Sequence, residues 1–197
     1  MTKLENLISE LCPHGVQYSS IGHLCAISTG GDVPKTCYSK NKTPEFEIPI
    51  YSNGIAENAL YGYTNIAKIK KPCVTVSARG TIGYCQIRET PFYPVIRLIC
   101  LIPDEEILSV HFLKYAVDMI KFQVPTTGIP QLTAPMVAKY RIPLPPLEVQ
   151  QEIVRVLDSF TELTAELNKE LEEEIIARRK QYEYYRDKLL TFKESVI

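Results

Sequence analysis

The sequence lacks the short motifs that mark common catalytic sites. Its 197 residues contain no G-x-x-x-x-G-K-[ST] loop, no H-E-x-x-H helix and no G-x-S-x-G turn. A Gly-rich loop between a strand and a helix, which a methyl-donor site would need, is also missing, as is the strand and helix alternation of a parallel sheet. We therefore expect no catalysis by this chain alone and predict no cofactor.

Paired cysteines are absent as well. The six cysteines form no C-x-x-C pair, and the N-terminal segment lacks the apolar stretch of a signal peptide. Cys12 and His14, and likewise His23 and Cys25, lie two residues apart in the sequence. However, C-x-H and H-x-C are not usual zinc spacings, so no metal site is predicted. No apolar run approaches the length of a membrane span. These features predict a reduced, cytoplasmic protein that does not enter a membrane.

The last quarter of the chain contains neither Gly nor Pro, and most of its apolar residues follow one another at steps of three or four. This is the spacing of a coiled-coil seam, in which a second four-residue step at Leu171 to Ile175 predicts local straightening. A helix from Glu148 to Phe192 would extend about 65–70 Å, longer than a domain of this size can cover. The predicted dimerisation residues are Ile153, Leu157, Phe160, Leu167, Leu171, Ile175, Tyr182, Tyr185 and Leu189.

The alternative is a solvated helix that packs along its first turns only, which would leave its C-terminal aromatic residues in water. Charge is also uneven along the chain. From Glu148 onward there are 12 acidic and 8 basic residues, giving −4, whereas the first 147 residues carry +3. This division is compatible with nucleic acid contacting the N-terminal part only.

The N-terminal part reads as a mixture of short helices and strands. Apolar spacing predicts helices near residues 4–11 and 109–122, and β-branched or aromatic runs predict strands at 47–51, 73–77, 82–87, 95–102 and 140–142. We predict an α+β fold: a globular domain with a small β-sheet and short helices over residues 1–146, then a long coiled-coil helix over residues 147–197.

Three loops carry polar and basic side chains without a clear packing role, although each taken alone is more simply a solvated connection. Arg79 lies at a predicted hairpin tip, where a guanidinium can pair with a guanine edge or a phosphate. Gly128 permits close approach of backbone to a ligand. The predicted DNA-binding residues are Lys35, Thr36, Ser39, Lys40, Lys42, Arg79, Thr81, Thr126, Thr127 and Gln131.

Four segments resemble the specificity subunit of Type I restriction-modification systems. They are, in order, LCPHGVQYSSIGHLCAISTGG, VTVSARGTIGYCQI, TTGIPQLTAPMVAKYRIPLPPLEVQQEIVRVLD and RRKQYEYYRDKLLTF. The pieces PLPPLEVQQEIV and YEYYRDKLL are highly specific, and the resemblance covers nearly the whole chain. It implies that residues 1–146 form a target recognition domain for double-stranded DNA and that residues 147–192 form a spacer helix.

The usual members of that family are about twice as long and carry two such units, which read the two halves of an interrupted DNA sequence. The resemblance implies a non-catalytic subunit that directs adenine methyltransferase (M) and restriction endonuclease (R) subunits to DNA. Two copies of this chain would pair their helices antiparallel as a homodimer. By analogy, residues 147–158 and the outer faces of the helix would contact the methyltransferase subunits.

Two other functions fit parts of the sequence. A coiled-coil scaffold without a nucleic-acid role would share the apolar seam and the net charge of −1, but it has no use for Arg79 or the lysines between positions 35 and 42. A nuclease or methyltransferase in its own right is disfavoured by the missing metal and cofactor motifs.

Overall fold

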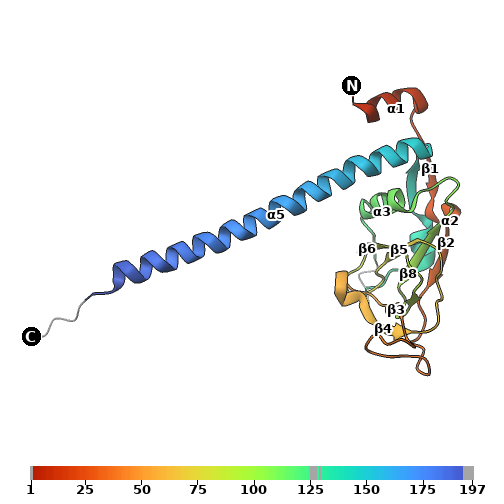
Figure 1. The fold of residues 1–197 in the computed structure, drawn as a ribbon. Helices are drawn as coiled ribbons and strands as arrows, with labels where there is room; N and C mark the ends of the chain where they lie inside the picture. The colour runs from red at the N-terminus through yellow and green to blue at the C-terminus, as the bar shows by residue number, and fades with distance from the viewer. Residues whose placement is uncertain (1, 125–127, 129, 193–197) are drawn as a thin grey trace, which may run out of the picture. The chain divides into compact units, whose positions relative to one another are not determined.

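The computed structural model describes residues 2–124, 128 and 130–192 (Figure 1). The chain divides into two compact units, residues 1–154 and 155–197. Helix α5, Leu147–Leu190, begins in the first unit and provides most of the described part of the second. The α+β fold with a long C-terminal helix is confirmed.

Short strands of the first unit form three small sheets. The antiparallel four-stranded sheet contains, in spatial order, β2 (Cys25–Thr29), β8 (Ile99–Pro103), β5 (Cys73–Val76) and β6 (Cys85–Arg88). The three-stranded sheet contains β4 (Leu60–Thr64), β3 (Ile48–Tyr51) and β7 (Tyr93–Pro94), with β7 parallel to β3. β1 (Gln17–Ser20) pairs with β9 (Arg141–Leu144), which places the start of the chain beside the segment that leads into α5.

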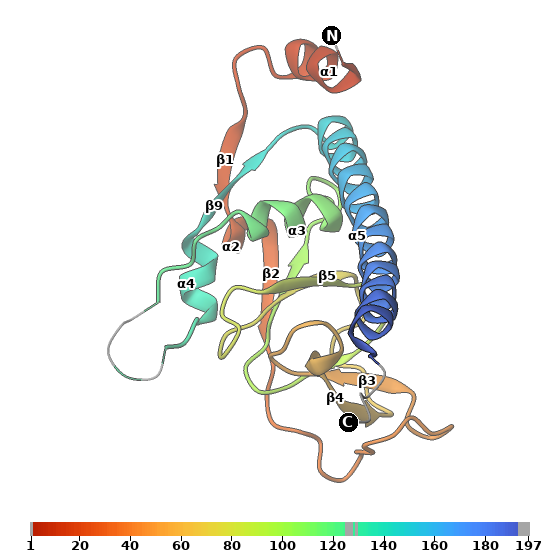
Figure 2. The same cartoon turned by 90° about the vertical axis from the view of Figure 1, so that its left-hand side faces the viewer.

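Short helices alternate with the strands along the first unit. They are α1 (Lys3–Leu11), α2 (Ile21–Leu24), the 3-10 helix η1 (Ala56–Ala59), α3 (Val110–Asp118) and α4 (Ala134–Lys139). α3 packs against β5, β6 and β8, and α2 packs against α4 (Figure 2). The helices therefore bury the apolar face of the four-stranded sheet.

The main core lies between α3 and the four-stranded sheet. Val74 and Val76 of β5, Leu101 of β8, and Leu113 and Val117 of α3 are completely buried there. Burying a side chain of this size contributes about 1.5–3 kcal/mol, so the first unit has a sufficient core of its own. A smaller cluster of buried residues consists of Ile69, Cys73, Phe92 and Cys100.

The first turns of α5 are anchored in the first unit by Gln150, which is completely buried. Its Nε2 donates to the carbonyl oxygens of Ile107 and Pro145, at 2.8 Å each, and its Oε1 accepts from the backbone N–H of Ser109 at 2.9 Å. One carboxamide thus satisfies three backbone groups at the junction between α3 and α5, groups that would be costly to bury unpaired.

Helix α1 is attached to α5 by an ion pair. Lys3 Nζ lies 2.9 Å from Glu152 Oε2, and Glu152 is only 3% exposed. The helix begins with a capping box in which Thr2 and Glu5 each accept from the other's backbone N–H. No residue of α1 is buried, so its predicted amphipathic pattern is present but its apolar face stays largely in solvent.

The six cysteines are all free thiols. Burial raises the pKa of Cys25 to about 12, which keeps this thiol protonated and unreactive at neutral pH. No helix in the described ranges combines the length and apolarity needed to cross a membrane.

The strands predicted at residues 47–51 and 73–77 are confirmed as β3 and β5. The strand predicted at residues 95–102 is confirmed from Ile99 onward as β8, but its first four residues are wrong, because a turn at Ile96 and Arg97 separates β7 from β8. The turn was not predicted because the segment is a run of apolar and β-branched residues, which is typical of a continuous strand. The predicted strand at residues 82–87 begins later, at Cys85, because the hairpin loop is longer than expected.

The helix predicted to reach Phe122 ends at Asp118. Ile120 and Phe122 still pack against the main core from the segment beyond the helix, and the Phe122 ring meets the Tyr140 ring at 5.0 Å between centroids. The helical spacing of apolar residues therefore extends beyond the end of the helix, because residues after the helix are also buried. Strands β1 and β4 and helix α4 were not predicted, because their sequences are short and polar or Gly- and Pro-containing, and the five-residue strand β2 was not predicted either.

Replacing Gln150 by Leu should lower the free energy of unfolding by at least about 2 kcal/mol, because three buried backbone groups lose their partner. Gln151, the adjacent exposed residue, provides the matched control, and Gln151→Leu should change stability by less than about 0.5 kcal/mol. Urea unfolding at one protein concentration measures both. Equal midpoints for the two variants would contradict the anchoring role of Gln150.

Candidate nucleic-acid interface

The loop between β5 and β6 spans residues 77–84 and presents Arg79 at its tip. Its base is closed by Ser77, whose backbone N–H donates to Tyr84 and whose carbonyl accepts from Gly83, at 2.9 and 3.0 Å. Gly80 and Gly83 have φ values of 70° and 85°, a left-handed conformation that glycine adopts at little cost. The predicted hairpin is confirmed, and Arg79 is exposed.

Arg79 is oriented by Gln131. Its Nε and Nη2 donate to Gln131 Oε1 at 3.0 and 2.5 Å, while the Leu132 N–H donates to the Ala78 carbonyl at 2.9 Å and fixes the two segments side by side. Neither side-chain bond uses Nη1, so the outer end of the guanidinium still presents donors with the geometry of a bidentate contact. The structure thus brings together two of the predicted DNA-binding residues.

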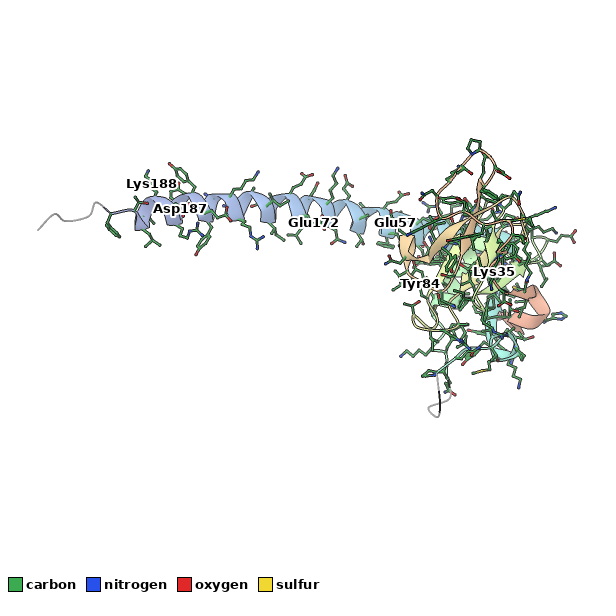
Figure 3. The ribbon with its side chains drawn as sticks, turned by 90° about the horizontal axis from the view of Figure 1, so that it is seen from below. Lys35, Glu57, Tyr84, Glu172, Asp187 and Lys188 are labelled. Carbon is green, nitrogen blue, oxygen red and sulfur yellow. The ribbon has the colours of Figure 1, made fainter. Side chains whose placement is uncertain are left out.

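The lysine-containing loop, residues 29–42, is attached to the three-stranded sheet. Ser39 exchanges two backbone hydrogen bonds with Tyr63 of β4, at 2.9 and 2.8 Å, and its hydroxyl donates to the Asn41 carbonyl at 2.7 Å. The Tyr38 ring packs on Tyr61 with centroids 5.8 Å apart. These contacts hold a loop whose remaining predicted residues are exposed: Lys35, which Figure 3 labels, Thr36, Lys40 and Lys42.

Thr81 is half-buried, unlike Arg79. Its hydroxyl oxygen is buried and has no hydrogen-bond partner among the described residues. Thr126 and Thr127 lie outside the described residues. The exposed members of the predicted set are therefore provided by two separate loops on two sheets.

Asn53, which follows β3, connects the Arg79 loop to another turn and was not predicted. Its Oδ1 accepts from the Ala78 N–H at 2.7 Å, and its Nδ2 donates to the Ile96 carbonyl at 2.6 Å. One side chain thus fixes the residues that directly precede Arg79 and Arg97. A single Asn after a strand gives no indication of such a role in the sequence.

The turn at Val95–Leu98 is strained. Leu98 N–H donates to the Val95 carbonyl at 3.1 Å, and Ile96 and Arg97 between them have φ values of 52° and 65°. Two positive φ values define a type I′ turn, which strongly favours Asn-Gly. A non-Gly residue in this conformation costs about 1–3 kcal/mol, and a β-branched residue is an outlier there.

Neighbouring backbone holds this turn in place. Ile96 and Arg97 donate their N–H groups to Gly31 and Gly30, at 2.9 and 3.2 Å. A Cβ at Gly30 would fall 2.6 Å from the Val95 carbonyl oxygen, so only glycine allows this close packing.

The third non-Gly residue with positive φ in the described chain, Ala56, also adjoins this region. It has a φ value of 50°, and its N–H donates to the Tyr84 hydroxyl at 3.3 Å. Figure 3 labels Tyr84, the acceptor of this bond, and Glu57, the residue after Ala56. Backbone strain is therefore concentrated around the loop that carries Arg79, as it often is at ligand-binding sites.

Across residues 2–124, 128 and 130–192, no three His, Cys, Asp or Glu side chains gather in a way that could hold a metal ion. The Cys85 thiol donates to Asp118 Oδ1 at 2.7 Å, and burial raises its pKa far above the ordinary value. This thiol stays neutral and is not a nucleophile.

Helix α5 carries the second predicted interface. Ile153 packs against the main core of the first unit. Beyond it, the predicted seam residues are between 36% and 68% exposed, and Figure 3 shows side chains standing out all along the helix. Arg178, a polar break in the seam, donates to Glu174 at 2.7 Å and to Gln181 at 3.0 Å. The exposed predicted seam residues are Leu157, Phe160, Leu167, Leu171, Ile175, Tyr182, Tyr185 and Leu189.

Comparisons with known proteins agree on one family. The family model of the Type I restriction modification DNA specificity domain matches residues 13–177. A putative type I specificity subunit from Mycoplasma pneumoniae is 35% identical over 169 residues, which cover 86% of this chain and 46% of that protein. A putative type I restriction enzyme specificity subunit from Haemophilus influenzae is 53% identical over 126 residues, covering 62% of this chain and 33% of that protein.

Solved structures show the same fold. A chain from a study of complex assembly in the type I R-M system aligns with a TM-score of 0.70 and 22% identity over 91% of this chain and 48% of that one. The S subunit of a Type I system from M. genitalium aligns with a TM-score of 0.67 and 17% identity, over 90% of this chain and 46% of that one.

This chain spans about half the length of the first relatives it matches. Its family is defined by DNA specificity and not by a catalytic activity. The loops on a β scaffold, the long helix and the match over residues 13–177 lead to one conclusion: the chain belongs to the Type I restriction modification DNA specificity family and is a non-catalytic member of such systems.

Proposed function

We propose that the first unit of this chain reads one half of a bipartite DNA target and that a second copy, paired along α5, supplies the other reading unit. The observation that carries this proposal is the exposed apolar seam of α5 in a chain that spans about half the length of its relatives. A second recognition unit must come from elsewhere if both halves of a site are to be read.

Pairing of two identical seams would bury the apolar side chains of both helices at once. Side chains such as Leu167 and Leu171 are more than half exposed, and burying one contributes about 1.5–3 kcal/mol. An antiparallel pair related by a twofold axis places one reading unit at each end. The same axis makes the two half-sites inverted copies of one another, so the target is palindromic apart from its spacer.

Arg79, positioned by Gln131, is the proposed base-reading residue, because its free end matches the O6 and N7 acceptors of guanine. The lysines at positions 35, 40 and 42 are exposed on a separately fixed loop, which suits contacts to phosphates that give affinity without sequence information.

The bound methyltransferase and endonuclease subunits would carry out the chemistry. The methyltransferase subunits would bring S-adenosylmethionine and modify adenine N6 at the address read by this chain, and endonuclease subunits would join them to cut unmodified DNA. The solved relative from a type I R-M assembly supports such partners. We place this activity in the cytoplasm, where six free thiols are compatible with a reducing environment.

Shortening α5 tests the paired arrangement. Deleting residues 164–170 removes one heptad, keeps the seam on one face and shortens each helix by about 10 Å. The spacer between the half-sites should then shrink by about 3 base pairs. The readout is a genome-wide map of methylated adenines in cells that also produce the methyltransferase subunits.

Lys169→Ala, which leaves the length of the helix unchanged, is the control and should preserve the original spacer. Retention of the original spacer by the deletion variant would refute α5 as the element that sets it. Methylated adenines produced by the purified chain with duplex and methyl donor, but no other subunit, would refute the division of labour.

Arg79→Ala should weaken binding of the assembled complex to its target duplex by about 1–3 kcal/mol and relax the sequence requirement at one position. Gln131→Ala should have a smaller effect in the same direction, because the guanidinium remains but is no longer oriented. Titrations of labelled duplexes measure both.

Lys40→Ala provides the contrast. It should lower affinity for all duplexes alike and reduce the slope of log affinity against log salt by about one unit. If Arg79→Ala also weakened all sequences equally, Arg79 would contact phosphate and the assignment of base reading would be wrong.

A further inference from the structure

We propose that the turn at Ile96 and Arg97 is a second base-reading element, which the Asn53 side chain fixes beside Arg79. This inference rests on the proposed function of the first unit in reading DNA. It assigns direct base contacts to two residues in a segment that its sequence pattern marks as an ordinary buried strand.

The placement follows from hydrogen bonds to one carboxamide. Asn53 accepts from the Ala78 N–H and donates to the Ile96 carbonyl, at 2.7 and 2.6 Å. Arg79 and Arg97 are the next residues along their segments. The two arginines thus extend from backbone positions that are held within the reach of a single side chain, as two readers of neighbouring base pairs must be.

The side chains of the turn are available to a ligand. Ile96 is 42% exposed, and Arg97 is also exposed and makes no hydrogen bond or ion pair through its guanidinium with the described residues. A free guanidinium matches the guanine O6 and N7 acceptors, and an aliphatic side chain matches the thymine methyl group. The pair thus presents a polar and an apolar reader side by side.

A purely structural role does not account for these residues. A type I′ turn is formed most readily by Asn-Gly, whereas Ile96 and Arg97 adopt positive φ at a cost. Neither side chain is buried by the turn. The Gly30 and Gly31 carbonyls and Asn53 hold the backbone in this conformation, which keeps both side chains directed away from the core.

The test is the double variant I96N/R97G in the full chain, assembled with its methyltransferase subunits. The substituted pair suits the backbone, so the melting temperature should equal or exceed that of the wild type. Affinity for the target duplex, defined by the methylation map of the wild-type complex, should fall by about tenfold or more, against less than about threefold for a scrambled duplex of equal composition.

R97K, which keeps the charge but loses the planar fork, provides a second measurement. It should reduce the preference for target over scrambled duplex while leaving the salt dependence nearly unchanged. If the double variant does not fold, an unchanged preference in R97K overturns the inference.

The outcomes separate this inference from the function beneath it. If the wild-type complex does not prefer its methylated sequence over the scrambled duplex, the proposed function fails. If the wild type discriminates and I96N/R97G discriminates equally well, the turn reads no bases and only this inference fails. Equal losses on both duplexes would make the turn a phosphate contact and would likewise overturn it.

Discussion

The hydrophobic seam of α5 imposes the constraint on which the rest of this account depends. Apolar side chains remain exposed along the seam from Leu157 to Leu189, interrupted by Thr164 and Arg178, and exposed apolar surface of this extent marks an interaction site. A seam of one helix fits a second helix of the same kind, because knobs of each can enter holes of the other. The simplest partner is another copy of the chain.

The same helix is part of the first unit at its start. Gln150 satisfies three backbone groups around α3 and α5, Glu152 pairs with Lys3, and Ile153 packs against the main core. In the proposed function, a helix that begins inside one folded unit and ends in an apolar seam connects base reading with assembly through continuous backbone.

The loops of the candidate interface differ from α5 in what stabilises them. Few of their side chains are buried, so their conformations depend on individual polar contacts: Arg79 with Gln131, Ser39 with Tyr63, and Asn53 with Ala78 and Ile96. Such contacts position donors accurately without burying them, as recognition of base edges requires.

Periodic features could be predicted from the sequence. The long helix, strands β3 and β5, the N-terminal helix and the hairpin tip at Arg79 each follow from local spacing or from a turn residue. Contacts between distant segments could not be predicted. The pairing of β1 with β9 joins Tyr18 to Pro143. A strand was predicted at residues 140–142, but the polar segment of β1 has no marked strand pattern.

The errors at residues 95–102 and 109–122 have the same origin. A run of apolar residues indicates that a segment is buried, but it does not indicate where a strand or helix begins or ends. Such a run can contain a turn, as at Ile96, or continue beyond the end of a helix, as at Phe122. Within the candidate interface, Arg79 could be predicted because it stands at a turn. Asn53 could not, because its importance lies in two backbone partners that are 25 and 43 residues away.

The most direct test of the central claim is the mass of the purified chain in solution, measured by sedimentation equilibrium over a range of concentrations. The seam predicts a reversible dimer, and Leu167→Asp together with Leu171→Asp should shift it to the monomer without unfolding the first unit. A wild-type chain that stays monomeric throughout that range would contradict the claim that α5 pairs with its own copy.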